Sequence, residues 1–259
     1  MGYEVRGMGY EVWGMRCGVV QCGQRRIAHQ QVWEKEERTR GKEPSSSRIA
    51  NSNKINTRKL DPQNFWNERF AEVDLVYGEA PNVWMKTCLD ARSPGSILFP
   101  AEGQGRNALY AAKKGWQVDA FDFSQVARDR ALAGADQQGV SIRYQLHTIQ
   151  DFEARPEQYD AVGLCYVHLP EAVRRPFYAK LIQSMKPGGE VFLEAFTHTQ
   201  LAHQSGGPRS EDLLFTRNII AHEFSELECI YLLELDTILL EGAYHHGPAH
   251  VVRFVGLKR

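Results

Sequence analysis

Apolar runs and amphipathic segments alternate along the chain from residue 96 onward. Five short apolar runs predict buried β-strands, over residues 97–99, 117–121, 141–146, 159–166 and 190–196. Three intervening segments have the spacing of helices, over residues 106–114, 124–137 and 171–185, and Ser124 is a favourable N-cap for the second. Strands that alternate with helices predict a parallel sheet with helices on both faces.

Both ends of this region depart from the alternation. Two short helices, the first over 64–72, precede the first strand. At the other end a helix is predicted over 210–222. Two β-rich runs follow, over 227–240 and 250–257, and a turn over 241–248 joins them. Because strands joined by a short loop pair antiparallel, the sequence predicts an α/β sheet whose last strand runs antiparallel.

The first 60 residues differ from the rest in charge and pattern. They carry a net charge of +6, whereas the remaining chain carries −7. A seven-residue repeat begins at Met1 and again at Met8, and each copy contains glycine, which disfavours a coiled coil. We therefore predict a low-complexity, basic, disordered tail over 1–60 and a folded domain over 61–259.

Composition disfavours several classes of partner. A net acidic domain is a poor electrostatic match to a phosphate backbone, so we expect no nucleic-acid partner. No stretch approaches the roughly 20 apolar residues that span a membrane, so no membrane partner is expected. Five scattered cysteines, an odd number, suit reduced thiols in a cytoplasmic protein. No metal site is predicted, and the oligomeric state is left open.

One segment carries the pattern of a nucleoside-binding turn. Gly103 and Gly105 follow the first strand and precede a helix, so the backbone there can approach a ligand closely. Asp122 ends the second strand, where a carboxylate can accept both hydroxyl hydrogens of a ribose. The spacing Gly103-x-Gly105-x-x-Ala108 fits a nicotinamide dinucleotide as well as S-adenosylmethionine. The antiparallel end of the predicted sheet favours S-adenosylmethionine.

At this point the chain resembles the class I S-adenosylmethionine-dependent methyltransferases, most closely the small-molecule branch with tellurite-resistance-type and thiopurine-type enzymes. The resemblance covers residue 65 to the end and rests on Phe65-Trp-Asn-Glu-Arg-Phe70 with Tyr77-Gly78, Glu102-Gly-Gln-Gly-Arg-Asn-Ala108, Phe121-Asp-Phe-Ser124, Tyr159-Asp-Ala-Val162, Leu181 with Lys186-Pro-Gly-Gly189, and the closing strand pair. It implies a Rossmann-like seven-stranded sheet in the order 3-2-1-4-5-7-6, with the last strand antiparallel. It also implies S-adenosyl-L-methionine as cofactor and a small-molecule acceptor.

Three positions depart from the family pattern at the glycine turn and after the third strand. Phe99 stands where the first strand usually carries an acid, and Ala101 stands where the turn has its first glycine. Glu102 is then the candidate to supply the missing carboxylate to the amino group of the cofactor. His147 stands where an acid is common after the third strand, which leaves Ile149 as a neighbour of the adenine.

The resemblance implies two groups of site residues. The candidate cofactor residues are Pro100, Ala101, Glu102, Gly103, Gly105, Asn107, Asp122, Phe123, Ile149, Gln150 and Cys165. The candidate acceptor residues are Trp66, Tyr77, Glu194, His198, His245 and His246. Tyr166 and His168 follow the fourth strand and are the candidate catalytic residues, since an imidazole that titrates near pH 6.5 can act as a general base.

The identity of the acceptor stays open at this level. A thiol, a chalcogen oxyanion or a heteroaromatic ring is expected, and carboxyl and hydroxyl groups also fit. The segment after the fourth strand lacks the Asn/Asp-Pro-Pro-Tyr/Phe pattern associated with amino-group methylation of nucleic-acid bases and of glutamine. Two alternatives stand beside the methyltransferase: an NAD(P)-dependent oxidoreductase, and a non-catalytic module that binds the cofactor, which Phe99 and Ala101 would favour.

Overall fold

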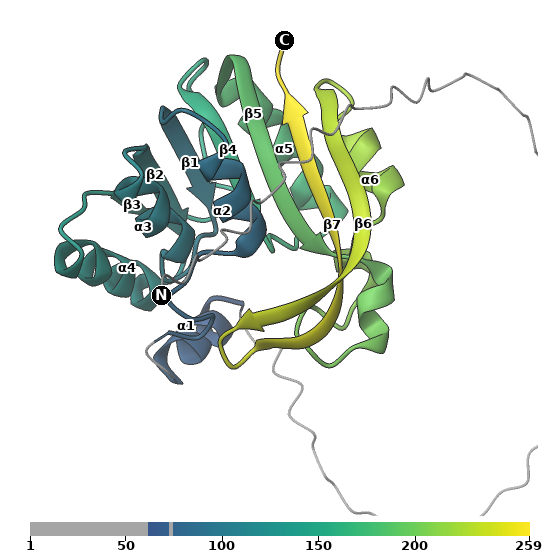
Figure 1. Ribbon diagram of the computed structural model, residues 1–259, viewed down its shortest axis with the longest axis horizontal. Helices are drawn as coiled ribbons and strands as arrows, with labels where there is room; N and C mark the ends of the chain where they lie inside the picture. The colour runs from purple at the N-terminus through teal and green to yellow at the C-terminus, as the bar shows by residue number, and fades with distance from the viewer. Residues whose placement is uncertain (1–61, 73–74) are drawn as a thin grey trace, which may run out of the picture. The chain divides into compact units, whose positions relative to one another are not determined.

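The computed structural model describes residues 62–72 and 75–259 (Figure 1). The predicted tail over 1–60 and its seven-residue repeat lie outside the described residues. Within the described part of the chain, no helix is both long enough and apolar enough to cross a membrane.

A mixed sheet of seven strands forms the centre of the described residues. The strands are β1 (Ser96–Pro100), β2 (Gln117–Asp122), β3 (Arg143–Leu146), β4 (Tyr159–Cys165), β5 (Met185–Phe196), β6 (Glu228–Glu241) and β7 (His245–Leu257). Their order is β3-β2-β1-β4-β5-β7-β6, in which β1 to β5 run parallel and β7 is antiparallel to both neighbours. The predicted sheet order and its antiparallel strand are confirmed.

Helices cover both faces of this sheet (Figure 1). Their bounds are α1 (Pro62–Glu72), α2 (Val83–Asp90), α3 (Arg106–Lys113), α4 (Gln125–Gln137), α5 (Glu171–Ser184) and α6 (Arg217–Glu223). Ile97 of β1 faces the layer of α2, α3 and α4, whereas Leu98 faces the layer of α5 and α6. Successive strand residues point to opposite faces, so a continuous apolar run fills both layers. Ser124 caps α4 as predicted, its hydroxyl accepting from Ala127 N.

Two elements near the end of the chain differ from the prediction. The helix predicted over 210–222 is shortened to α6, because Phe215 N donates to Phe196 O beside β5 and the backbone there is extended. The turn predicted over 241–248 is also shorter, since β6 continues to Glu241 and β7 already begins at His245. Gly242, with a φ of 70°, supplies the left-handed conformation that so tight a turn needs.

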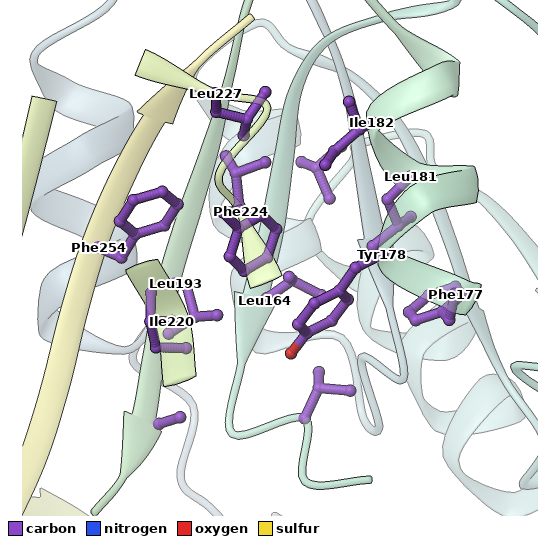
Figure 2. Close-up of a cluster of buried hydrophobic side chains, with 14 of the residues drawn as sticks. Leu164, Phe177, Tyr178, Leu181, Ile182, Leu193, Ile220, Phe224, Leu227 and Phe254 are labelled. Carbon is purple, nitrogen blue, oxygen red and sulfur yellow. The ribbon is translucent and has the colours of Figure 1, made fainter. Parts of the chain in front are cut away.

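Figure 2 shows the apolar layer beneath α5 and α6. Tyr178 of α5 stacks on Phe224 with ring centroids 4.6 Å apart, and Phe224 stacks on Phe254 of β7 at 5.0 Å. A buried ion pair joins the same two helices, with Arg174 Nη2 2.6 Å from Glu223 Oε1. These contacts fix the segments that follow β4 and precede β6, which both reach the carboxyl ends of the parallel strands.

Phe99, one of the departures from the family pattern, packs against a glycine in the neighbouring strand. A Cβ added at Gly163 of β4 would lie 2.3 Å from Phe99 Cε1, and the Phe99 side chain is fully buried. The phenylalanine thus fills space in the layer of α2, α3 and α4 that a side chain at residue 163 would otherwise take. An aromatic residue on β1 and a glycine on β4 form one packing unit.

The first prediction follows from this unit. Gly163→Ala should lower the free energy of unfolding by about 1–3 kcal/mol, because the added methyl overpacks the ring. Urea denaturation of the full chain measures the loss. Combining Gly163→Ala with Phe99→Leu should cost less than the sum of the two single losses, since the smaller side chain makes room. Strictly additive losses would show that the two positions do not share this space.

Candidate active site

The carboxylate of Asp122 joins two loops at the carboxyl ends of β1 and β2. Its Oδ2 accepts from Gly103 N at 3.1 Å, and its Oδ1 accepts from Ser124 N at 2.8 Å. The Tyr144 hydroxyl donates to Gly103 O at 2.6 Å and holds the glycine turn from the other side. Asp122 is 5% exposed, and burial raises its pKa. The backbone of Phe123 is a third donor to this carboxylate, which has about four lone-pair sites and can therefore still accept from a ligand hydroxyl.

The two glycines of the turn have different surroundings. A Cβ at Gly105 would lie 2.7 Å from Ala131 Cβ, so glycine there permits α3 to pack closely on α4. A Cβ at Gly103 would instead meet the Phe70 ring of α1 at 3.1 Å. Gly103 therefore faces the space between the turn and α1, while Gly105 has a packing role that accounts for it without a ligand.

Glu102 caps the helix that follows the turn. Its Oε1 accepts from the backbone N of Asn107 and of Ala108, both at 2.8 Å, and Asn107 Nδ2 lies 3.3 Å from Oε2. Burial raises the pKa of this carboxyl to about 7. With three donors around it, Glu102 serves the N-terminus of α3 first, which differs from the expectation that it reaches the amino group of a cofactor. Ala101 takes a φ of 48°, the left-handed conformation that explains the glycine usual at this position.

Helix α1 lies over the turn between β2 and α4. Gln63 Nε2 donates to Phe123 O at 2.9 Å, and the Ser124 hydroxyl donates to Asn67 Oδ1 at 2.6 Å. Trp66 stacks on Phe70, with ring centroids 5.5 Å apart. Trp66, a candidate acceptor residue by sequence, thus lies in an apolar cluster of α1 with Phe70.

The remaining cofactor candidates end the parallel strands or follow them. Pro100 closes β1 and is buried, Ile149 is buried in the segment after β3, and Gln150 beside it is exposed. Cys165 ends β4, and burial raises the pKa of its thiol far above the usual range. All four positions therefore lie at the edge of the sheet to which the strand directions point.

Asn82 connects four elements at this edge through a fully buried side chain. Its Nδ2 donates to Glu194 Oε1 at 2.6 Å and to Glu241 Oε1 at 2.9 Å, which are the ends of β5 and β6. Its Oδ1 accepts from Met85 N and caps α2. Its own backbone N donates to Asn107 Oδ1 at 2.9 Å, so the network reaches the first turn of α3.

Two arginines balance the two buried carboxylates. Arg106 Nη2 lies 2.8 Å from Glu241 Oε2, and Arg253 pairs with Glu194 Oε2. Burial opposes ionisation of Glu241, but His245 and Arg106 outweigh it and hold the pKa of Glu241 at about 2. The network is therefore a set of paired charges, as buried ions require.

Four aromatic rings gather beside this network. The His245 ring lies 4.5 Å from Tyr77, 4.6 Å from Tyr166 and 5.3 Å from Phe196, measured between centroids. Tyr166 has a φ of 55°, an uncommon conformation for a bulky residue and one found at functional sites. We call Tyr77, Tyr166, Phe196 and His245 the aromatic cluster. The cluster brings together Tyr77, Tyr166 and His245, which the sequence predicted separately. Glu194 lies beside it, because the Tyr166 hydroxyl donates to Glu194 Oε1 at 2.8 Å.

The two candidate catalytic residues are not placed as general bases. His168 Nδ1 lies 2.7 Å from Leu213 O, and its Nε2 accepts from Phe196 N at 3.4 Å, so backbone groups occupy both nitrogens. Burial lowers the pKa of His168 to about 4. The Tyr166 hydroxyl donates to a carboxylate, and burial raises its pKa well above the usual range. His168 is thus engaged by the backbone and the Tyr166 hydroxyl by Glu194, and a catalytic role for either residue stays a prediction.

Two other predicted acceptor residues lie apart from the cluster. His198 has its Nδ1 3.6 Å from Glu211 Oε1 on a partly exposed 3-10 turn. His246 follows His245 along β7, so its side chain points to the opposite face and is exposed. Neither side chain belongs to the cluster that holds His245.

Sequence reasoning missed several residues of the network, namely Asn82, Arg106, Phe196, Glu241 and Arg253. Asn82 could have been found as an N-cap before a predicted helix, and Arg106 from its place beside the glycine turn. Nothing in the local sequence distinguishes Glu241 or Arg253 from ordinary strand charges.

A groove opens beside the glycine turn, between α3, α4 and the segment 75–79. It has a volume of about 480 Å³ and is lined in part by Tyr77, Glu102, Gln104, Arg106 and Gly134. This volume suits a small molecule. Among the described residues, no three His, Cys, Asp or Glu side chains are grouped closely enough to hold a metal ion.

A sheet of this order, with a glycine turn and a buried acid at the carboxyl ends of β1 and β2, defines a Rossmann-like nucleoside-binding protein. Residues 97–189 match the family model described as a methyltransferase domain. The ubiquinone biosynthesis O-methyltransferase of Rickettsia bellii (strain OSU 85-389) is 27% identical over 150 residues. That match includes 56% of this chain and 62% of the relative, so the chain spans less than two thirds of the curated relative's length.

Solved structures share the fold at low identity. TehB from Haemophilus influenzae matches with a TM-score of 0.59 at 16% identity, over 76% of this chain and 67% of that chain. The 1,6-didemethyltoxoflavin-N1-methyltransferase of Burkholderia thailandensis, with bound S-adenosylhomocysteine, matches with a TM-score of 0.52 at 14% identity, over 68% and 78%. Residues 97–189 thus match a methyltransferase domain, and the described residues share the fold of solved methyltransferases, so the resemblance drawn from the sequence is confirmed.

The second prediction concerns the buried carboxyl of Glu102. Because its pKa is raised to about 7 in the folded chain, the unfolded chain loses this proton at lower pH than the folded chain. The stability contributed by protonated Glu102 is therefore fully present below about pH 4.5 and is lost as the pH rises through about 7. This loss lowers the free energy of unfolding by up to about 3 kcal/mol. Glu102→Gln keeps an oxygen for the two backbone donors and does not titrate. Urea denaturation gives the free energy of unfolding of both proteins at pH 5 and pH 8. The value for the variant, relative to that of the native chain, should be higher at pH 8 than at pH 5.

If the difference in free energy of unfolding between the two proteins stayed constant across this pH range, the raised pKa of Glu102 would be contradicted. Asp129→Asn on the exposed side of α4 is the matched control, because this carboxyl lies on the surface.

Proposed function

We propose that the protein transfers a methyl group from S-adenosylmethionine to a small-molecule acceptor. The observation that carries the proposal is the pairing of Asp122 with Gly103, which holds a buried carboxylate against the glycine turn. This geometry fits a ribose with two free hydroxyls. The family match over residues 97–189 includes both of these positions and supports the same conclusion.

Different residues would bind different parts of the cofactor. Asp122 would hold the ribose hydroxyls, Gly103 would let the backbone approach, and Phe123 with Ile149 would flank the adenine. S-adenosylmethionine, when bound, supplies an electrophilic methyl group on a positively charged sulfur. The chain then has to orient the acceptor and exclude water. The aromatic rings of α1 and the aromatic cluster would contribute to both.

The acceptor proposed is a small molecule that carries a hydroxyl, thiol or ring nitrogen. The Rickettsia relative is named as an O-methyltransferase and the Burkholderia enzyme as an N1-methyltransferase of a heteroaromatic compound, and these names support the class. The net acidic charge beyond residue 60 disfavours a nucleic-acid acceptor. Aromatic walls around His245 suit a planar organic molecule.

The third prediction tests the cofactor site. Full-length protein should bind S-adenosylhomocysteine in isothermal titration calorimetry, and Asp122→Asn should weaken binding at least about tenfold, because one charge-assisted acceptor is lost. Asp129→Asn, an equal change on exposed α4, should leave the affinity unchanged. Circular dichroism confirms that each variant is folded.

NADH serves as the competing ligand in the same titrations. Binding of NADH without S-adenosylhomocysteine would favour an oxidoreductase, and binding of neither would remove the cofactor site. Tight binding of S-adenosylhomocysteine, with no methyl transfer from S-adenosylmethionine to any acceptor tried, would favour the non-catalytic module.

A further inference from the structure

We propose that His245 is the residue that takes the proton from the methyl acceptor, and that this acceptor is a hydroxyl or thiol on an aromatic ring. The inference rests on the proposed methyl transfer and adds a catalytic residue and a substrate class to it. It starts from a buried histidine nitrogen that has no hydrogen-bond partner among the described residues, His245 Nδ1.

His245 and Glu241 have the arrangement of a histidine–carboxylate pair. Nδ1 lies 3.5 Å from Glu241 Oε2, too long for a good hydrogen bond but on the correct side of the ring. Such bonds are often long without ligand and shorten in the reacting complex. With its proton on Nδ1, the imidazole carries its lone pair on Nε2, at the opposite edge. The Gly206 backbone packs on that edge, where a Cβ would be 3.2 Å from Nε2, so the acceptor must approach the nitrogen beside this glycine.

Glu241 is held firmly enough to orient the imidazole. Its Oε2 also pairs with Arg106 at 2.8 Å, and its Oε1 accepts from the buried Asn82 Nδ2 at 2.9 Å. The carboxylate therefore stays ionised beside the ring, where it stabilises the imidazolium formed on proton transfer. Glu241 is a positioning residue in this arrangement, because it acts through His245.

The groups that face His245 keep the ring neutral before reaction. Burial and the positive charge of Arg106 lower the pKa of His245, while Glu241 and Glu194 raise it. Tyr77 and Tyr166 pack against the ring, and their hydroxyls have raised pKa values, so neither carries charge at neutral pH. A neutral imidazole with a free lone pair is the form that accepts a proton.

Other histidines near the cluster are engaged elsewhere. His168 has backbone groups at both nitrogens, and His250 Nδ1 lies 2.6 Å from Thr197 Oγ1. His198 pairs with Glu211, and His246 is exposed on the opposite face of β7. His245 thus stands apart by combining burial, a carboxylate partner and contact with Tyr166, which directly follows β4.

The surroundings also indicate the acceptor. Tyr77, Tyr166 and Phe196 present ring faces or edges within 5.3 Å of the imidazole, which suits a flat aromatic ring. The buried charges near the cluster are already paired, which disfavours a charged acceptor. A neutral hydroxyl or thiol gives His245 a proton to remove.

The step balances without any further reagent. The acceptor oxygen or sulfur uses a lone pair to bond the methyl carbon, and the bond from that carbon to the sulfonium breaks with its electron pair going to sulfur. The acceptor proton moves to His245 Nε2, and the imidazolium later releases it to water. Arg106 and Glu241 keep their charges throughout.

The fourth prediction is tested first without any acceptor. Nitrogen-15 NMR of histidine-labelled full-length protein, assigned with His245→Gln, reports the tautomer and pKa of His245 with and without saturating S-adenosylhomocysteine. We expect a neutral ring protonated on Nδ1 at pH 7 and a pKa below the ordinary 6.5. Glu241→Gln should lower this pKa further and weaken the tautomer preference, because a negative partner is removed. A ring protonated on Nε2, or an imidazolium at pH 7.5, would overturn the proposal.

Turnover supplies the second measurement, with 4-methylphenol and, at about pH 6, 4-methylthiophenol as probe acceptors that are mostly neutral, and S-adenosylmethionine as donor. His245→Gln should lower kcat roughly 10²-fold or more and abolish the acidic limb of the pH profile, since a general base is worth about that much. The affinity for S-adenosylhomocysteine should not change, and His246→Gln, the exposed neighbour, should behave like the native chain.

Each other outcome has a distinct meaning. If the native protein binds S-adenosylhomocysteine but methylates neither probe, the proposed acceptor class is wrong. If His245→Gln keeps full turnover, the proton transfer does not depend on this residue. If S-adenosylhomocysteine does not bind at all, the proposed function itself fails, and the inference fails with it.

Discussion

Burying a carboxylate is unfavourable unless donors or cations surround it, and this constraint organises the edge of the sheet where ligands are expected. Four carboxylates are gathered there, those of Glu102, Asp122, Glu194 and Glu241. Each is satisfied by groups from other elements: the first turn of α3, the glycine turn, Asn82, or an arginine. The hydrogen bonds and ion pairs of these carboxylates therefore hold the loops at this edge in place.

Hydrogen bonds connect the glycine turn, where we propose the cofactor binds, to β5 and β6 beside the aromatic cluster. Glu102 accepts from Asn107, Asn107 accepts from the backbone of Asn82, and Asn82 donates to both Glu194 and Glu241. The glycine turn is thus joined to β5 and β6 by hydrogen bonds between buried groups. In the proposed reaction this network would hold the two reacting molecules in a fixed orientation, which is the main contribution a protein makes to a displacement reaction.

The departures from the family pattern also have physical reasons. Phe99 takes a place usual for an acid, and Gly163 on the next strand leaves room for its ring. Glu102, two residues after the strand ends, returns a carboxylate to the turn, where it caps α3. Ala101 accepts a left-handed backbone in place of glycine, at a cost of about 1–2 kcal/mol that the surrounding bonds must offset.

Local patterns in the sequence determined the order of the elements, the helix cap at Ser124, and the glycine turn with Asp122, because each depends on residues close together in the chain. The tertiary structure alone decided which distant side chains meet. His168 was a reasonable base by position, yet its partners are backbone atoms, whose identity no sequence pattern records. Tyr77 and His245 lie at opposite ends of the domain sequence, and only the fold brings their rings to 4.5 Å.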